Sequence, residues 1–258
     1  MTTSWPQLKY GRFRMTNRLR LLQLTKLLDV TRLNDYDDAV QMADWLKKQP
    51  TLPVSVAAYC VYPEYLTELR EFSEYSRQQF AYATVVNFPE GKTPLDVVCQ
   101  QISAALAAGA TEIDCVMPYQ ALLRGDHQYV SDFLTEVRRH CGSTCLKVII
   151  ESGELITAQQ VAKATELAID CGADFVKSST GKVAVGITED AARIMLTIIA
   201  AADRPVGFKA SGGVRTIAQA LQLTDLYEEI TGIVATSDTM RIGASALVAE
   251  LAERFAVD

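Results

Sequence analysis

The segment Asp174–Lys182, which reads DFVKSSTGK, shows the unit from which the rest of the chain is built. Its first half is apolar like a strand, and its second half is a polar loop that contains Gly181. A helix-like segment follows at about 188–202. Lys177 lies inside the apolar half, where an ammonium group must find a carboxylate or lose its proton. The simpler alternative is a lysine whose stem lies along the strand while its head reaches water.

The same order of strand, loop and helix recurs along the chain and decides the fold class. The expected strands are Leu27–Thr31, Val54–Cys60, Ala83–Phe88, Glu112–Pro118, Leu146–Glu151, Asp174–Ser178, Val206–Ser211 and Met240–Gly243. The expected helices lie at roughly 35–48, 63–78, 93–108, 127–141, 157–171, 188–202, 216–230 and 245–256. Eight such units predict an α/β fold, a (β/α)8 TIM barrel, in a single domain over residues 1–258. A doubly wound open sheet is the alternative, but no GxGxxG motif follows the first strand.

Local signals support several helix starts and leave the eighth strand ambiguous. Four threonines stand where an N-cap is needed, and the first of them precedes a proline suited to the first helical position: Thr93, Thr157, Thr188 and Thr216. The run Ile230–Ala235 also has strand character, so it competes with Met240–Gly243 for the last unit.

The N-terminal part is basic and contains no acid. Its cations within residues 1–28 are Lys9, Arg12, Arg14, Arg18, Arg20 and Lys26. This bias is typical of a transit peptide. The favoured interpretation is an extension over residues 1–26 that ends in an amphipathic helix at roughly 16–27. This helix is expected to pack on the barrel through Leu19, Leu22 and the stem of Lys26.

The composition of the chain argues against several classes of binding partner. A net charge of −6 argues against nucleic acid, whose phosphates reward a basic surface, and no apolar run has the length of a membrane span. The six cysteines lack paired CxxC spacing, which argues against zinc. With no secretory signal, reduced thiols in the cytoplasm are expected. A homodimer through outer helices is one option that the sequence leaves open.

Strand parity places opposing charges inside the barrel. Side chains alternate between the two faces of a strand, and the apolar sets of each run should face the helices. The inward faces then carry Asp29, Asp114, Lys147, Lys177 and Lys209. Barrel interiors are normally filled by branched apolar residues, so five inward charges on five strands indicate a functional site.

Lysine chemistry fits this set best. The two histidines, His127 and His140, both belong to one helical segment and are expected at the surface. This argues against a metal-dependent aldolase and a Ser-His-Asp hydrolase. An unprotonated lysine attacks a carbonyl to form a Schiff base, although the ordinary lysine pKa is about 10.4. A neighbouring cation on the next strand, Lys209, would lower the pKa of Lys177.

The loops after the last three strands offer an anion site. They read Thr180-Gly181-Lys182, Ser211-Gly212-Gly213-Val214-Arg215 and Ile242-Gly243-Ala244-Ser245. Glycines allow backbone amides to approach an oxyanion, and barrels commonly bind phosphate after strands seven and eight. A Gly-Gly pair alone is also an ordinary turn, so the indication rests on its coincidence with Gly243 and with a cation.

At this point the sequence resembles the 2-deoxyribose-5-phosphate aldolase family, class I aldolases on a (β/α)8 barrel. The matching pieces cover the chain from about residue 20 to 250 in the family's order: LDVT (28–31), AYCVYP (58–63), VNFP (86–89), EID (112–114), LKVIIESGEL (146–155), DFVKSSTGKVAV (174–185), GFKASGGVRT (207–216) and GAS (243–245).

The resemblance implies a role for each matched residue. Lys177 would form the Schiff base with acetaldehyde, Lys209 would perturb it and Asp114 would relay protons. Asp29 and Lys147 would support this relay, while Cys60 and Thr180 would line the pocket. The phosphate of the substrate would be held by Gly181, Lys182, Gly212, Gly213, Gly243 and Ser245. The substrates would be a small phosphorylated sugar and acetaldehyde, with no metal and no organic cofactor.

The chain departs from the family pattern in a few places. It stops at Phe255-Ala256-Val257-Asp258, without the terminal tyrosine that assists proton transfer in some members. Ala246 stands where a second serine is common, and Ala210 where a proline is common. Alternatives are a Schiff-base aldolase or transaldolase for another sugar phosphate, an isomerase that uses lysine and aspartate as acid and base, and a barrel that only binds a phosphorylated ligand.

Overall fold

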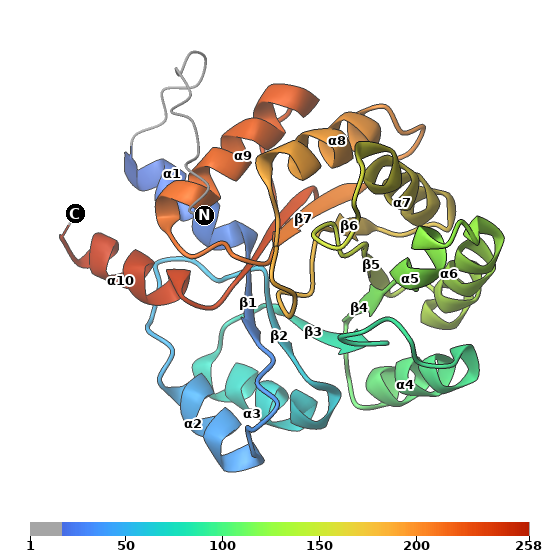
Figure 1. The fold of residues 1–258 in the computed structure, drawn as a ribbon. Coiled ribbons are helices and arrows are strands. Elements are labelled where there is room, and N and C mark those ends of the chain that lie inside the picture. The colour runs from blue at the N-terminus through green and yellow to red at the C-terminus, as the bar shows by residue number, and fades with distance from the viewer. Residues whose placement is uncertain (1–16, 258) are drawn as a thin grey trace.

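The computed structural model describes residues 17–257, in which eight parallel strands close into a barrel in chain order (Figure 1). The strands are β1 (Leu28–Arg32), β2 (Ala58–Val61), β3 (Ala81–Val86), β4 (Glu112–Val116), β5 (Cys145–Ile149), β6 (Phe175–Lys177), β7 (Gly207–Ser211) and β8 (Met240–Ala244). β8 pairs with β1 and closes the ring, with Asp29 opposite Gly243. The prediction of a (β/α)8 barrel is confirmed.

Helices surround the strands on the outside of the barrel (Figure 1). They are α1 (Asn17–Leu27), α2 (Ala39–Lys47), the 3-10 turn η1 (Pro63–Tyr65), α3 (Leu66–Ser76), α4 (Leu95–Ala107), α5 (Tyr119–Leu123), α6 (His127–Cys141), α7 (Ala158–Asp170), α8 (Glu189–Ala200), α9 (Ile217–Thr231) and α10 (Leu247–Val257). The sequence did not predict α5, whose single turn is too short to show a helical period.

Two strand predictions are decided by backbone pairing. β2 begins four residues later than the apolar run at Val54, because its parallel ladder to β1 starts with Ala58 opposite Asp29. The run Ile230–Ala235 is not a strand, since α9 continues to Thr231 and ends on Gly232 at φ +73°. The left-handed conformation of this glycine terminates the helix, so Met240–Ala244 supplies the eighth strand.

Three of the four predicted caps are confirmed. The side chains of Thr157, Thr188 and Thr216 accept hydrogen bonds from backbone amides in the first turns of α7, α8 and α9. The prediction for Thr93 is wrong. Pro94 occupies the N-cap position of α4, and the Thr93 amide donates to Asn87 Oδ1 at 2.8 Å.

The predicted N-terminal helix forms, but a different face packs on the barrel. Leu21, Leu24 and Thr25 are buried and the predicted Leu22 is partly buried, whereas Leu19 is half exposed and Lys26 is exposed. Successive leucines give this segment two apolar faces, so periodicity alone does not choose between them. Residues 1–16 of the predicted extension lie outside the described residues.

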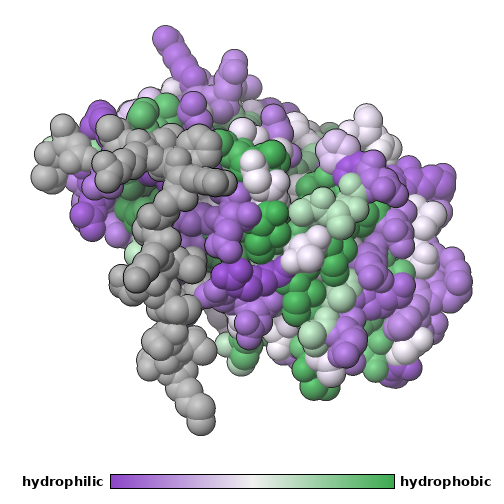
Figure 2. Space-filling model, turned by 90° about the horizontal axis from the view of Figure 1, so that it is seen from above, coloured by the Kyte–Doolittle hydropathy of each residue, from purple (hydrophilic) through white to green (hydrophobic). Residues whose placement is uncertain are grey.

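The core lies between the strands and the helices. Figure 2 shows the molecule from above, turned by 90° from the view of Figure 1. On this face, hydrophobic residues lie among larger hydrophilic areas. Such scattered apolar groups are normal on a folded surface. Within residues 17–257, no helix combines the length and the apolar character that a membrane span requires.

Candidate functional site

Asp114 on β4 is the centre of a buried charge cluster in the barrel interior. Its Oδ1 accepts a hydrogen bond from Lys147 Nζ at 2.8 Å. Its Oδ2 accepts one from Lys177 Nζ at 2.7 Å and another from Lys209 Nζ at 2.8 Å. Asp29 lies 2.5 Å from Lys209 Nζ through its Oδ2. The structure therefore brings together all five inward charges that strand parity predicted, each at most 2% exposed.

Beneath this cluster a second layer adds two charges that the sequence analysis did not single out. Arg241 on β8 donates to Asp29 Oδ1 at 2.7 Å and to Glu112 Oε1 at 2.8 Å. Its guanidinium carbon stands 5.4 Å from the ring centroid of Phe175. Gly207 makes room for this ring, because a Cβ atom at that position would lie 2.3 Å from it. Arg241 thus neutralises carboxylates from β1 and β4 below the lysines.

The charge cluster shifts the pKa values of Lys177 and Lys209 in opposite directions. Burial disfavours the charge of Asp114, but Lys147, Lys177 and Lys209 together hold the pKa of its carboxyl well below the usual range. Burial lowers the pKa of Lys177; Asp114 counters this, while the nearby Lys209 lowers it further. The pKa of Lys209 is raised, because Asp114 and Asp29 outweigh the effect of burial. Of these two amines, Lys177 is therefore the one prepared to lose its proton.

Cys60 occupies the barrel wall beside the cluster. It is fully buried and packs with Ala58, Ala83 and Val85. Burial, followed by the charge of Asp114, raises the pKa of this thiol to about 11. Cys60 is consequently a neutral group that limits the width of the interior on this side.

Glu151 anchors the loop that follows β6. This buried carboxylate, at φ +52°, accepts hydrogen bonds from Ser179 Oγ and Thr180 Oγ1, both at 2.5 Å. The two hydroxyls in turn accept from the amides of Gly181 and Lys182, at 3.1 and 3.0 Å. The amides of Thr180, Gly181 and Lys182 are thus already satisfied inside the protein. A bound anion would meet the loop mainly through the Lys182 side chain.

Two of the glycine loops lie against each other. Gly181 adopts φ +78°, and a Cβ atom there would stand 3.7 Å from Gly212 Cα. Gly212 and Gly213 follow with φ +84° and +86°, a conformation that favours glycine. Gly243 instead packs close to Lys209, because its Cβ would lie 3.4 Å from that side chain. The four predicted glycines therefore divide into three in the loops and one in the barrel wall.

Ser245 and Lys182 border the mouth of the barrel. Ser245 lines an open pocket of about 340 Å³ together with Trp45 and residues 31–34, which form the end of β1 and the start of the loop after it. Lys182 Nζ donates to Asp35 Oδ1 at 3.0 Å, and Tyr62 Oη donates to the same oxygen at 2.5 Å. Asp35 therefore ties the loop after β1 to the loop after β6.

The residues missed by sequence reasoning fall into two groups. Glu112 and Arg241 have the same parity as Asp114 and Gly243, so the rule that found the other charges could have found them. Asp35 and Tyr62 belong to separate loops that meet only in three dimensions, and no local pattern marks their contact.

Comparison with known proteins gives a family and a set of similar structures. A sequence model described as DeoC/LacD family aldolase matches residues 25–247. A proposed deoxyribose-phosphate aldolase from Coccidioides immitis is 26% identical, with a TM-score of 0.79, over 91% of this chain and 87% of that one. A protein with the same proposed description from Toxoplasma gondii ME49 is 23% identical, with a TM-score of 0.85, over 93% and 97%. A deoxyribose phosphate aldolase from Aeropyrum pernix, described as a unique tetramer, is 22% identical, with a TM-score of 0.67, over 94% and 99%. At these identities the last two comparisons show the fold alone.

Proposed function

Because the chain belongs to the DeoC/LacD family of aldolases, we propose that it reversibly cleaves 2-deoxy-D-ribose 5-phosphate to acetaldehyde and D-glyceraldehyde 3-phosphate. One observation carries the proposal: Lys177 and Lys209 donate to the same oxygen of Asp114 inside the barrel. Two amines on one buried carboxylate oxygen disfavour a second ammonium charge. This supports a neutral amine at Lys177, the form that attacks a carbonyl.

The reaction follows from this arrangement. The Lys177 amine adds to the C1 aldehyde of the open-chain sugar, and loss of water gives an iminium ion. The C3 hydroxyl then gives up its proton, and the C2–C3 bond breaks. Its electron pair enters the iminium, which releases glyceraldehyde 3-phosphate and leaves an enamine. Protonation of the enamine at C2 and hydrolysis release acetaldehyde and restore the amine.

The neighbours of Lys177 have distinct proposed roles. Asp114 lies within hydrogen-bond distance of Lys177 Nζ and relays protons, while Lys209 keeps Lys177 neutral. Asp29 and Lys147 fix the orientation of Asp114 and Lys209 from behind.

The substrate phosphate is assigned to the mouth of the barrel. Its proposed contacts are Lys182, Gly212, Gly213 and Ser245, with Gly181 and Gly243 allowing close approach. Cys60 and Thr180 are proposed to line the substrate site between the phosphate and Lys177. The cytoplasmic location and the homodimer stay predictions.

A cleavage assay tests the function directly. The purified chain is expected to convert 2-deoxy-D-ribose 5-phosphate to acetaldehyde and glyceraldehyde 3-phosphate in equal amounts, each measured by a coupled dehydrogenase. A panel of other sugar phosphates serves as the comparison. Preferential cleavage of another sugar phosphate would favour the alternative aldolase or transaldolase, and isomerisation without cleavage would contradict an aldolase.

Lys209→Met is expected to move the acid limb of the kcat/KM pH profile to higher pH. Lys209 lowers the pKa of Lys177. Its removal also leaves Asp114 with one cation fewer, so this carboxylate holds the Lys177 ammonium more strongly. Both effects raise the pKa of Lys177, and the neutral amine then forms only at higher pH. Lys209→Arg retains the charge and should keep more of the original profile. An unmoved limb in Lys209→Met would show that Lys209 does not set the pKa of Lys177.

Asp35→Asn is expected to lower KM for the phosphorylated substrate about two- to five-fold. This fold-change corresponds to the free energy that an exposed ion pair typically contributes. The Asp35 carboxylate holds Lys182 and repels a dianion at the same place. Removing its charge frees Lys182 and leaves the Lys177 cluster untouched. Steady-state kinetics with 2-deoxyribose, which has no phosphate, is the control and should not change. An equal change in KM for both sugars would place the effect elsewhere.

A further inference from the structure

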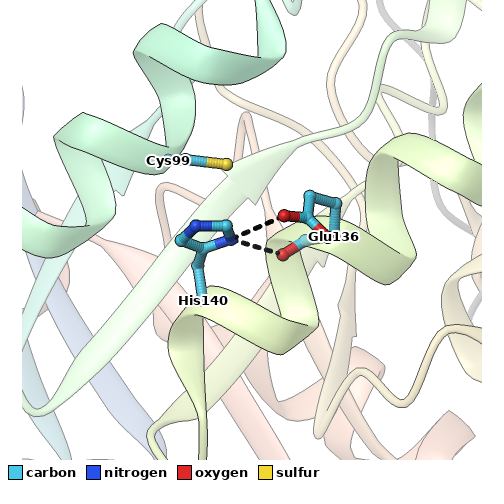
Figure 3. A group of neighbouring side chains, drawn as sticks. All are labelled: Cys99, Glu136 and His140. Atoms are coloured by element: carbon cyan, nitrogen blue, oxygen red, sulfur yellow. Dashed lines mark hydrogen bonds and ion pairs between the residues drawn. The ribbon is translucent and has the colours of Figure 1, made fainter.

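A second group of reactive side chains lies on the outer helices. Cys99 belongs to α4, while Glu136 and His140 lie one turn apart on α6 (Figure 3). One donor atom from each of the three residues lies within 4.8 Å of the other two. The lysine cluster, by contrast, lies on the strands inside the barrel. The proposed aldolase chemistry therefore gives this group no role.

The three donors suit one class of ligand. A thiolate, an imidazole and a carboxylate together are ligands typical of Zn²⁺ and of similar divalent transition metals. Metal–ligand bonds of about 2.0 to 2.3 Å in a tetrahedron place neighbouring donors roughly 3.3 to 3.8 Å apart. The donor atoms, now up to 4.8 Å apart, must approach one another by about an ångström to bind such an ion. Rotations of the side-chain torsions can provide this movement without moving the two packed helices.

The local hydrogen bonds show what binding would displace. His140 Nδ1 lies 3.0 Å from the carbonyl oxygen of Glu136 and 3.3 Å from its carboxylate. Arg139 donates to both carboxylate oxygens of Glu136, at 2.6 and 2.9 Å, and is 67% exposed. An exposed ion pair contributes little stability, and coordination bonds are much stronger, so a metal ion bound by Glu136 would displace Arg139 into solvent.

We propose that Cys99, Glu136 and His140 bind one zinc-class divalent metal ion, with water in the fourth position, and that this ion links α4 to α6. The side chains of His140 and Glu136 are 24% and 34% exposed, which leaves a path for the ion and for the water. On binding, the Cys99 thiol releases its proton to solvent and the thiolate sulfur bonds to the metal. Cysteine spacing alone does not predict this site, because its ligands come from two helices that are far apart in the sequence.

Cobalt titration of the chelator-treated full chain tests the site. Co²⁺ bound through a cysteine gives a sulfur-to-metal charge-transfer band and the intense visible bands of a tetrahedral ion. One equivalent is expected to saturate both, and Zn²⁺ should abolish them. Saturating Zn²⁺ should also raise the melting temperature by about 5 °C, since it binds only the folded chain.

Variants assign the signal to residues. Cys99→Ser is expected to remove the charge-transfer band and the Zn²⁺-dependent rise in melting temperature, and His140→Ala should remove the tetrahedral bands. The matched control is Cys171→Ser, which replaces a different free cysteine at the end of α7. This variant should keep the charge-transfer band and the Zn²⁺-dependent rise in melting temperature. Absence of the band in the unmodified protein, or its persistence in Cys99→Ser, would overturn the proposal. Aldol cleavage is measured separately, because the metal site does not depend on the proposed function.

Discussion

Lys177→Met is expected to lower kcat/KM for aldol cleavage on the order of 10⁴-fold or more, the scale on which enzymes lose activity with their nucleophile. The side chain keeps its apolar stem and loses the amine that Asp114 now holds at 2.7 Å. No other group of the cluster can replace it, because Lys147 and Lys209 are each held by two or more carboxylates.

Reductive trapping identifies the reacting amine itself. With acetaldehyde, Lys177 Nζ should condense to an iminium ion with loss of water. Hydride from borohydride then adds to the iminium carbon and leaves an ethyl group on Nζ that peptide mass spectrometry locates. Lys182→Met is the control, because Lys182 lies at the mouth of the barrel and this reaction needs no phosphate site. An ethyl group on another lysine, or equal trapping in Lys177→Met, would refute the assignment.

Arg241→Met is expected to lower the free energy of unfolding by about 3 kcal/mol, the lower part of the range for breaking a buried ion pair. Arg241 is 6% exposed and serves Asp29 and Glu112 together. Each carboxylate keeps one lysine at 2.5 Å, Lys209 and Lys147 respectively, so the charges are not left alone. Chemical denaturation with a fixed slope measures the change.

A second variant separates charge from packing. In Arg241→Met combined with Glu112→Gln, one of the two buried carboxylates that lost Arg241 is neutral, and at least about 1 kcal/mol of the loss should return. If the double variant is less stable than the single one by the full cost of Glu112→Gln alone, the two residues do not interact and the explanation fails.

The residues that the sequence identified best are those governed by local geometry. Strand parity is a property of the backbone, so five inward charges could be located without knowing how the strands pair. The same rule applied to β8 would have found Arg241. The face of α1 could not be predicted, because its leucines support two faces and the choice depends on contacts with α9 and α10. The contact between Asp35 and Tyr62 could not be predicted from the sequence, because the two residues lie on different loops whose paths depend on the whole fold.

The phosphate loops show a further limit of motif reading. The motif suggested that the amides after β6 are open to an anion, because glycine permits close approach. The structure shows the amides of Gly181 and Lys182 bonded to Ser179 and Thr180 instead. Which backbone amides are free depends on Glu151, whose carboxylate accepts hydrogen bonds from these two hydroxyls and lies in the loop after β5.

Glu151 also bears on how the site responds to its substrate. A loop that must order itself when a ligand arrives loses conformational entropy at that moment and weakens the affinity. Here the turn after β6 is already held by a buried carboxylate through hydrogen bonds to two hydroxyls and one amide. Its ordering belongs to folding rather than to binding, so the rim beside Lys177 is preorganised. A sugar phosphate then needs to immobilise little more than itself and the end of one lysine side chain.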